Sequence, residues 1–292
     1  MGAVAMGRVA LLTVALSILL LLGATACGER SEPTGVTAPL YPVTVQSAND
    51  RTVVVTEPAR RIAVLDRPAE AILEELGVGG RIVMRAPAGR IDFAALRRSH
   101  PDLIVASGDA SLRDLSRAAS VTRAQVYTAP GDSIRQVEHA IAQLGLLAGA
   151  PIASRALVRR IESQRHAVDA RIARAPRVKV FVDTGFSTTV SDQSLIGDVL
   201  REAGGTNVGG AAAETGPVEI SELLRLDPDV YLATSDTELT LMDLRKNPRL
   251  RKLRAIRLGH FAVVNADLLQ PGPRVGEGLT EIAHLLHPNA FR

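Results

Sequence analysis

The chain has 292 residues; 46% are hydrophobic, 3% are aromatic, and the formal net charge is +3. This length suits two ordinary domains or one large one, and the hydrophobic content is ample for a folded core. A nucleic-acid surface would need a dense basic patch interleaved with stacking aromatics, but the basic residues look scattered and tryptophan is absent. We therefore expect no nucleic-acid partner.

The N-terminus has the organisation of an export signal. A single positive charge, Arg8, precedes an apolar stretch over 9–22, and four small residues follow at 23–26. Cys27, the only cysteine, comes next, and this order resembles a bacterial lipoprotein signal in which Cys27 is lipidated. We expect a signal peptide over 1–26 and a lipid anchor on the outer face of the cytoplasmic membrane. An ordinary secreted protein and an uncleaved anchor are the alternatives.

Folded sequence is predicted to begin after a tether. Residues 27–42 are rich in proline and small polar residues, which favours a flexible segment between the lipid and the first domain. Two β-branched runs, 43–45 and 52–56, then flank an Asn-Asp turn. This pattern predicts a β-hairpin.

Alternating strands and helices follow the hairpin. Residues 61–65 are typical of a buried strand, a helix is expected to start at Pro68 and end at Gly77, and 81–84 form another short strand. Strand, helix and strand at this spacing indicate a parallel α/β sheet.

A near-repeat suggests two lobes of similar construction. Residues 96–107 and 224–234 both read as the end of a helix, a Pro-Asp step, and a buried strand that ends in a hydroxyl residue. Chance similarity of a common helix-turn-strand unit is the alternative. Residues 134–144 and 150–175 have helical spacing, and the second lies between the two copies. It either bridges the lobes or belongs to one of them.

Several motifs in this order resemble the bilobal substrate-binding proteins of iron-siderophore, haem and cobalamin ABC importers. They include 58–64, 100–107, 194–208 and the Pro-Gly-Pro-Arg of 271–274, and the resemblance runs from about Tyr41 to Pro288. It implies the class III periplasmic-binding-protein fold, which has two Rossmann-like α/β lobes with parallel-rich sheets joined by one long rigid helix. The expected boundaries are 43–149 for the first lobe, 150–175 for the helix and 176–292 for the second lobe.

The resemblance also implies a function. The protein would capture a ferric siderophore or similar metal chelate and deliver it to an ABC permease dimer with its ATPase, as a monomer, without a cofactor and without chemical turnover. Relatives dock on the permease through a glutamate on each lobe. Ala94 and Ser221 align with these glutamates, so Asp92 and Glu222, one or two residues away, are the docking candidates.

The ligand is expected beyond the carboxyl ends of the parallel strands. The candidate residues that follow predicted strands or belong to the loops of the second lobe are Asp66, Arg67, Arg85, Ser107, Phe186 and Arg274. Guanidinium groups suit carboxylates and other anions, which favours an anionic chelate, although each arginine has an alternative as a solvated charge and Arg274 as a brace for its own loop. Cobalamin binders wall the cleft with aromatics. The aligned positions here are Pro87, Ala88, Ser107, Thr184 and Thr215, so a polar chelate is favoured over a large macrocycle.

Three other functions stay open. A bare-metal binder would need three or four converging histidines and carboxylates, but none of the six histidines follows a predicted strand in the cleft. A hydrolase would need a nucleophile elbow, and Gly185-Phe186-Ser187-Thr188-Thr189 lacks the closing glycine. The third alternative is an orphan surface lipoprotein with a sensing or scaffolding role.

Overall fold

The computed structural model describes residues 40–86, 90–213 and 216–292. The predicted signal peptide, Cys27 and most of the predicted tether lie outside the described residues. The chain divides into Met1–Leu40 and Tyr41–Arg292, and only the second unit is described below. Its first residue is already packed, because the Tyr41 hydroxyl donates a hydrogen bond to the Leu146 carbonyl at 2.6 Å. Within the described ranges no helix is both long enough and apolar enough to cross a membrane.

The N-terminal hairpin is confirmed. Strands β1 (Val43–Gln46) and β2 (Thr52–Val55) pair antiparallel, and buried and exposed residues alternate along both. This alternation is typical of a ribbon with one face on a core and the other in solvent. Its turn is fixed to the neighbouring sheet, because Ser47 Oγ accepts a hydrogen bond from the buried Thr128 N–H at 2.6 Å.

The first sheet is parallel throughout and has the strand order β4-β3-β5-β6. Its strands are β3 (Ile62–Val64), β4 (Ile82–Arg85), β5 (Leu103–Ser107) and β6 (Gln125–Ala129). The helices between them are α2 (Arg67–Glu75), α3 (Phe93–Arg98) and α4 (Leu112–Thr122), with a 3-10 turn η1 (Gly79–Arg81) before β4, and α5 (Ile134–Leu147) follows β6. Residues 103–106 of β5 are buried on both faces, as expected for a central strand covered by helices.

Polar caps set where these helices begin. The side chains of Asp66, Asp92, Ser111 and Ser133 accept hydrogen bonds from backbone N–H groups in the first turns of α2, α3, α4 and α5. Each cap satisfies an N–H group that has no partner within its helix. Asp66 and Ser111 therefore fix the chain where it leaves the neighbourhood of β3 and β5.

The second sheet repeats the first. Its order is β8-β7-β9-β10, again parallel throughout, so corresponding strands occupy corresponding places. The strands are β7 (Val178–Asp183), β8 (Gly205–Asn207), β9 (Val230–Thr234) and β10 (Phe261–Val264). The Pro-Asp near-repeat falls on β5 and β9, which hold the same position in the two sheets.

The remaining helices surround this second sheet. They are α7 (Leu195–Glu202), α8 (Ile220–Leu226), α9 (Leu241–Lys246), α10 (Arg254–Leu258) and α11 (Val275–Leu286), with short 3-10 segments η2 (Gly210–Ala212), η3 (Ser235–Thr237), η4 (Leu250–Lys252), η5 (Ala266–Leu269) and η6 (Pro288–Phe291).

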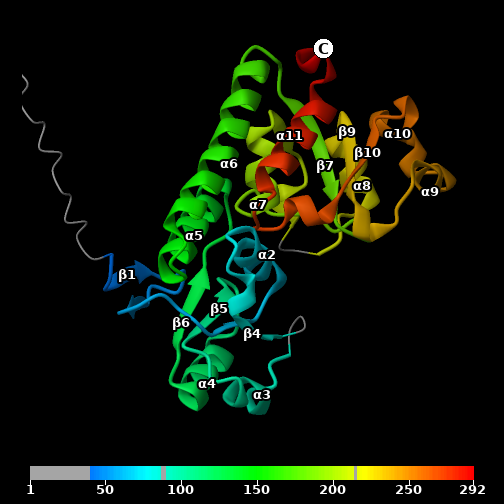
Figure 1. Cartoon of the computed structure of the whole chain (residues 1–292). Helices are drawn as coiled ribbons and strands as arrows, with labels where there is room; N and C mark the ends of the chain where they lie inside the picture. Colours follow the sequence, from blue (N-terminus) through cyan, green and yellow to red (C-terminus); the bar gives the residue numbers. More distant parts are fainter. Residues whose placement is uncertain (1–39, 87–89, 214–215) are drawn as a thin grey trace, which may run out of the picture. The chain divides into compact units, whose positions relative to one another are not determined.

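One long helix, α6 (Pro151–Ile172), follows the first sheet and precedes the second in the chain (Figure 1). It packs on α5 and α11, and the missing side chains of Gly145 and Gly276 admit Ser154 and Gln164 of α6 at close range. A single hydrophobic cluster contains residues of both sheets and of these helices. The long helix therefore rests on elements from both halves of the described chain.

Ion pairs reinforce the same junction. Arg165 of α6 contacts Glu138 of α5 at 3.2 Å and Glu202 of α7 at 2.8 Å. The buried Ile134 N–H at the start of α5 donates to Asp198 of α7 at 2.9 Å. Burial raises the pKa of Glu138, and Arg165 opposes that rise.

Candidate ligand-binding cavity

A cavity of about 930 Å³ lies beyond the carboxyl ends of β3, β5 and β6. The chain leaves β3 toward β4 on one side and returns to β5 on the other, so β3 and β5 flank the point where the strand order reverses. Ligands of open α/β sheets bind at such switch points. The position of this cavity agrees with the place that the sequence predicts for a ligand.

Three turns at the ends of β3, β5 and β6, formed by residues 65–68, 107–111 and 129–132, build most of the cavity wall. The lining residues that the structure describes are Ala48, Leu65, Asp66, Arg67, Pro68, Ala86, Arg90, Ile91, Ser107, Gly108, Asp109, Ala110, Ser111, Asp114, Leu115, Ala129, Pro130, Gly131, Asp132, Gln136, Gln270 and Pro271. Only the last two come from beyond α6. Pro271 approaches Gly131 so closely that a Cβ on this glycine would lie 2.8 Å from the proline ring.

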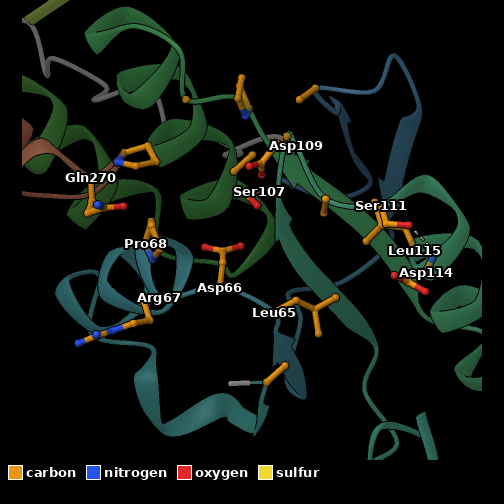
Figure 2. A pocket seen from close by; sticks show the side chains of 18 of the residues that line it. Leu65, Asp66, Arg67, Pro68, Ser107, Asp109, Ser111, Asp114, Leu115 and Gln270 are labelled. Atoms are coloured by element: carbon orange, nitrogen blue, oxygen red, sulfur yellow. Dashed lines mark hydrogen bonds between the residues drawn. The ribbon is translucent and has the colours of Figure 1, made fainter. Parts of the chain in front are cut away.

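Asp66 is the most unusual group in this wall. Its Oδ1 caps α2 by accepting the Ala69 N–H at 2.8 Å, whereas Oδ2 is shielded from solvent and has no hydrogen-bond partner among the described residues. Burial raises the pKa of this carboxyl and the nearby Asp109 carboxylate adds to the rise, whereas the backbone N–H groups of Ala69 and Ser107 oppose it. Figure 2 shows Asp66 between Pro68 on one side and Ser107 on the other, with the Arg67 side chain extending away from it.

The structure brings together three of the six predicted ligand residues: Asp66, Arg67 and Ser107 line the cavity. Arg85 is not among the described lining residues. It pairs with Glu70 and with Glu74, the latter at 3.4 Å, and these partners raise the pKa of its guanidinium.

The two predicted residues of the second lobe also lie elsewhere. Phe186 is 97% exposed and has a left-handed backbone with φ 54°. Arg274 pairs with Glu277 at 2.7 Å, one turn along α11, as the loop-bracing alternative anticipates. Neither is among the described residues that line the cavity.

Several lining residues were not among the predicted site residues. Asp109 and Ala110 follow β5 directly, so the rule that singled out Ser107 points to them as well. Ala48 could not be found this way, because it reaches the cavity only through the docking of the hairpin turn on β6, where its N–H donates to Thr128 O at 2.9 Å. Gln136 likewise depends on tertiary packing, whereas Gln270 belongs to the 267–274 loop of the second lobe, where a site residue was expected.

Both docking candidates lie at helix starts. Asp92 caps α3, and hydrogen bonds from the Ala95 and Ala94 N–H groups lower the pKa of its carboxyl. Glu222, in the first turn of α8, receives a hydrogen bond from Arg225 at 2.6 Å, which lowers its pKa.

The corresponding end of the second sheet carries a closed polar cluster. Asp183, at the end of β7, is 2% exposed and accepts hydrogen bonds from Tyr231 Oη at 2.5 Å and from the Gly185 N–H at 2.8 Å. Burial and the Asp183 charge raise the pKa of Tyr231, so its hydroxyl stays a donor. In this lobe both oxygens of the aspartate accept hydrogen bonds from the protein itself.

The described residues contain no cluster of metal ligands. Across residues 40–86, 90–213 and 216–292, no three histidine, cysteine, aspartate or glutamate side chains converge in a way that could hold a metal ion. A metal that entered the cavity inside a chelate would not need such a cluster.

Comparison with known proteins identifies the class. A family model described as periplasmic binding protein matches residues 48–268, well over half of the chain. The chain therefore belongs to the periplasmic binding protein family, and the predicted class III fold, with two parallel α/β sheets, is confirmed.

Individual relatives agree with this family. YvrC of Bacillus subtilis strain 168, described as an uncharacterized ABC transporter substrate-binding lipoprotein, is 22% identical over 283 residues, which cover 87% of this chain and 88% of YvrC. Helicobacter pylori CeuE with Ni(II) bound has a TM-score of 0.72 at 16% identity and covers 85% of this chain and 90% of its own. A protein of Saccharomonospora viridis described as an ABC-type Fe3+-hydroxamate transport system has a TM-score of 0.67 at 19% identity, with 84% and 99% covered.

Proposed function

We propose that this protein is an exported, lipid-anchored solute receptor that captures a ferric siderophore or similar metal chelate and hands it to an ABC permease dimer with its ATPase. The observation that carries the proposal is the cavity at the switch point of the first sheet, in a chain of the periplasmic binding protein family. The cavity volume of about 930 Å³ is in the range that is usual for small-molecule sites, which suits a metal chelate.

The lining chemistry supports binding over catalysis. The described lining residues include no histidine, lysine or cysteine, so neither cavity serine has a base of these types in the wall. Ser111 already accepts the Asp114 N–H as the cap of α4. This arrangement supports a receptor and gives no support to the hydrolase alternative.

The relatives support the class of ligand and partner. YvrC is described as an ABC transporter substrate-binding lipoprotein, and the Saccharomonospora viridis protein as part of an Fe3+-hydroxamate transport system. A Ni(II)-bound relative adds a metal complex to the group. Since identities of 16% and 19% show the fold alone, the chelate bound by this chain is a proposal.

Thermal unfolding of the full chain in detergent micelles tests the ligand. A ligand that binds the native state raises its stability by mass action, so a saturating ferric hydroxamate is expected to raise the melting temperature in a dose-dependent way. Haem and cobalamin serve as comparison ligands, with the iron-free hydroxamate as the matched control. If no ferric chelate shifts the transition, the proposed ligand class is wrong.

Uptake separates a transport receptor from an orphan lipoprotein. Cells that lack this chain are expected to lose uptake of the chelate that the purified chain binds, and the wild-type gene should restore it. Undiminished uptake with intact binding would favour the sensing or scaffolding alternative.

The anchor is tested by replacing its cysteine. Cys27→Ser is expected to release the mature chain from the membrane fraction, because Cys27 is the only cysteine available for the lipid. Retention of this variant in washed membranes would contradict lipid anchoring at this residue.

A further inference from the structure

The cationic residues of the chain are not evenly scattered but are concentrated in one segment. Residues 241–260 contain seven arginines and lysines and one carboxylate, Asp243. Their surplus of six positive charges is twice the formal net charge of +3 for the whole chain, so the rest is net acidic. A local charge asymmetry of this size points to an anionic partner.

These cations lie on one contiguous segment of the second lobe. Helices α9 and α10 lie next to each other (Figure 1), and both contact the turn η4. Leu244, Leu250, Leu253 and Ile256 belong to one buried cluster. The cationic side chains lie outside, and all seven residues are exposed: Arg245, Lys246, Arg249, Arg251, Lys252, Arg254 and Arg257. We call this set the basic face.

Most of this charge is not neutralised within the protein. Lys246 pairs with Asp243 at 2.8 Å, and Arg254 pairs with Asp229. In the part of the chain that the structure describes, no carboxylate forms an ion pair with the other five, which are Arg245, Arg249, Arg251, Lys252 and Arg257. Of these five side chains, only that of Arg245 donates a hydrogen bond to another described residue, through its guanidinium to the Ile256 carbonyl.

Apolar side chains stand beside the cations. Met242 is 64% exposed and Leu258 is 56% exposed, one on each of the two helices. Cations that flank exposed apolar groups suit a lipid surface, where phosphates meet acyl chains. The segment 241–260 contains no Phe, Tyr or Trp on which bases could stack, which disfavours a nucleic acid.

The length of the tether limits how far the packed unit can lie from the membrane. If Cys27 carries the lipid, as proposed above, thirteen residues separate it from Tyr41, the first residue of the packed unit. Fully extended, that segment spans at most about 50 Å. The domain is then confined close to the membrane, and a weak electrostatic contact is sufficient to orient it.

We propose that the basic face is a docking surface for anionic phospholipid headgroups and holds the anchored receptor against its own membrane. The contact depends on phosphate charge. It therefore weakens with salt and is absent on zwitterionic lipid.

A single introduced cysteine reports on this contact. The full chain carrying Met242→Cys is labelled with an environment-sensitive fluorophore and reconstituted into phosphatidylcholine vesicles with or without phosphatidylglycerol; labelling of the wild-type chain corrects for Cys27. Ile152→Cys is the matched control, because Ile152 is an apolar side chain, 75% exposed, on α6. We expect a blue shift for Met242→Cys only with phosphatidylglycerol, and none for Ile152→Cys.

The second part of the experiment removes positive charge from the basic face. Arg249→Gln, Arg251→Gln and Lys252→Gln together are expected to weaken the response roughly tenfold or more, since each cation near an anionic surface contributes favourably. High salt should act in the same way, and soluble glycerol phosphate should give no shift. An equal signal on both vesicle types, or an unchanged signal in the triple variant, would overturn the proposal. A wild-type chain that fails to remain on vesicles of either type would instead contradict the lipid anchor.

Discussion

The two lobes place an aspartate near the end of the same strand but use it differently. In the first lobe Asp66 follows β3 and leaves Oδ2 without a partner beside a cavity. In the second lobe Asp183 ends β7 and accepts hydrogen bonds from the Tyr231 hydroxyl and the Gly185 N–H. The same topology therefore carries one carboxylate with an oxygen that lacks a hydrogen-bond partner and one whose two oxygens both accept hydrogen bonds.

A one-residue offset accounts for the difference. Val64 pairs with Val105 of β5, and Val182 pairs with Leu232, the corresponding residue of β9. Val64 therefore corresponds to Val182, and Leu65 corresponds to Asp183. Asp66 lies one residue further along the chain. Successive side chains of an extended chain point to opposite faces. Asp183 therefore shares a face with Phe181 and its core, whereas Asp66 shares a face with Val64 and α2. The two lobes therefore share one strand order, whereas only the first places this aspartate beside the ligand cavity.

The largest loss of stability is expected at the closed polar cluster around Asp183. Asp183→Ala leaves the buried Tyr231 hydroxyl and the Gly185 N–H without an acceptor, and should lower the free energy of unfolding by about 2 to 3 kcal/mol. Urea unfolding measures this loss. Adding Tyr231→Phe removes the orphaned hydroxyl, so the double variant should lose less than the sum of the two single changes. Strict additivity would show that the two side chains do not interact.

The next effect is expected where the lobes meet on α6. Arg165→Leu removes the partner of Glu138 and Glu202, and should cost about 2 kcal/mol because both carboxylates are largely shielded. Burial already raises the pKa of Glu138, and loss of Arg165 raises it further. A raised carboxyl pKa gives stability at low pH that is lost as pH rises through it, so the deficit should grow from acid to neutral pH. The exposed Arg159→Leu on the same helix is the control. A deficit that is independent of pH would argue against the Glu138 pair.

A smaller effect is expected at the hairpin, which only the first lobe has among the described residues. Ser47→Ala leaves the buried Thr128 N–H unpaired, and should cost about 1 kcal/mol in thermal or urea unfolding. Thr44→Ala, at an exposed position of β1, is the control and should change little. Equal effects of the two substitutions would mean that the turn is not held by this bond.

The smallest effect on stability is expected at Asp66. Asp66→Asn keeps an acceptor for the α2 cap and removes a carboxylate whose pKa is raised by burial, so the free energy of unfolding should stay within about 0.5 kcal/mol at pH 7 or increase. In the wild type, stability falls as pH rises through the raised pKa of Asp66, and the variant should lack this dependence above about pH 4. Asp92→Asn, an exposed cap outside the cavity, is the matched control. A large loss at Asp66 would mean that its carboxylate is structural, as Asp183 is.

Much of the fold could be predicted because local chemistry repeats. The Pro-Asp steps before β5 and β9, the Pro68 helix start and the Asn-Asp hairpin turn each act over a few residues. The long helix between the repeats is visible as a helical period, although α6 ends at Ile172, three residues before the predicted end.

The site was only partly predictable because side-chain direction depends on tertiary partners. Arg85 does lie at a strand end, but Glu70 and Glu74 of α2 form ion pairs with its guanidinium. Phe186 follows β7, and the left-handed backbone at Phe186 and Ser187 belongs to a loop in which the ring stays exposed. Strand ends can be read from sequence, but the faces to which their side chains turn require the packing of the neighbouring elements.

Equilibrium dialysis of an iron-labelled ferric hydroxamate against the full chain tests the central claim most directly. Ala110→Trp places a bulky ring in the cavity wall after β5, and should reduce affinity about tenfold or more while the melting temperature without ligand stays near that of the wild type. Arg85→Ala, at a strand end outside the cavity, should bind as the wild type does. Full affinity in Ala110→Trp, or no binding by the wild type, would contradict a chelate receptor built on this cavity.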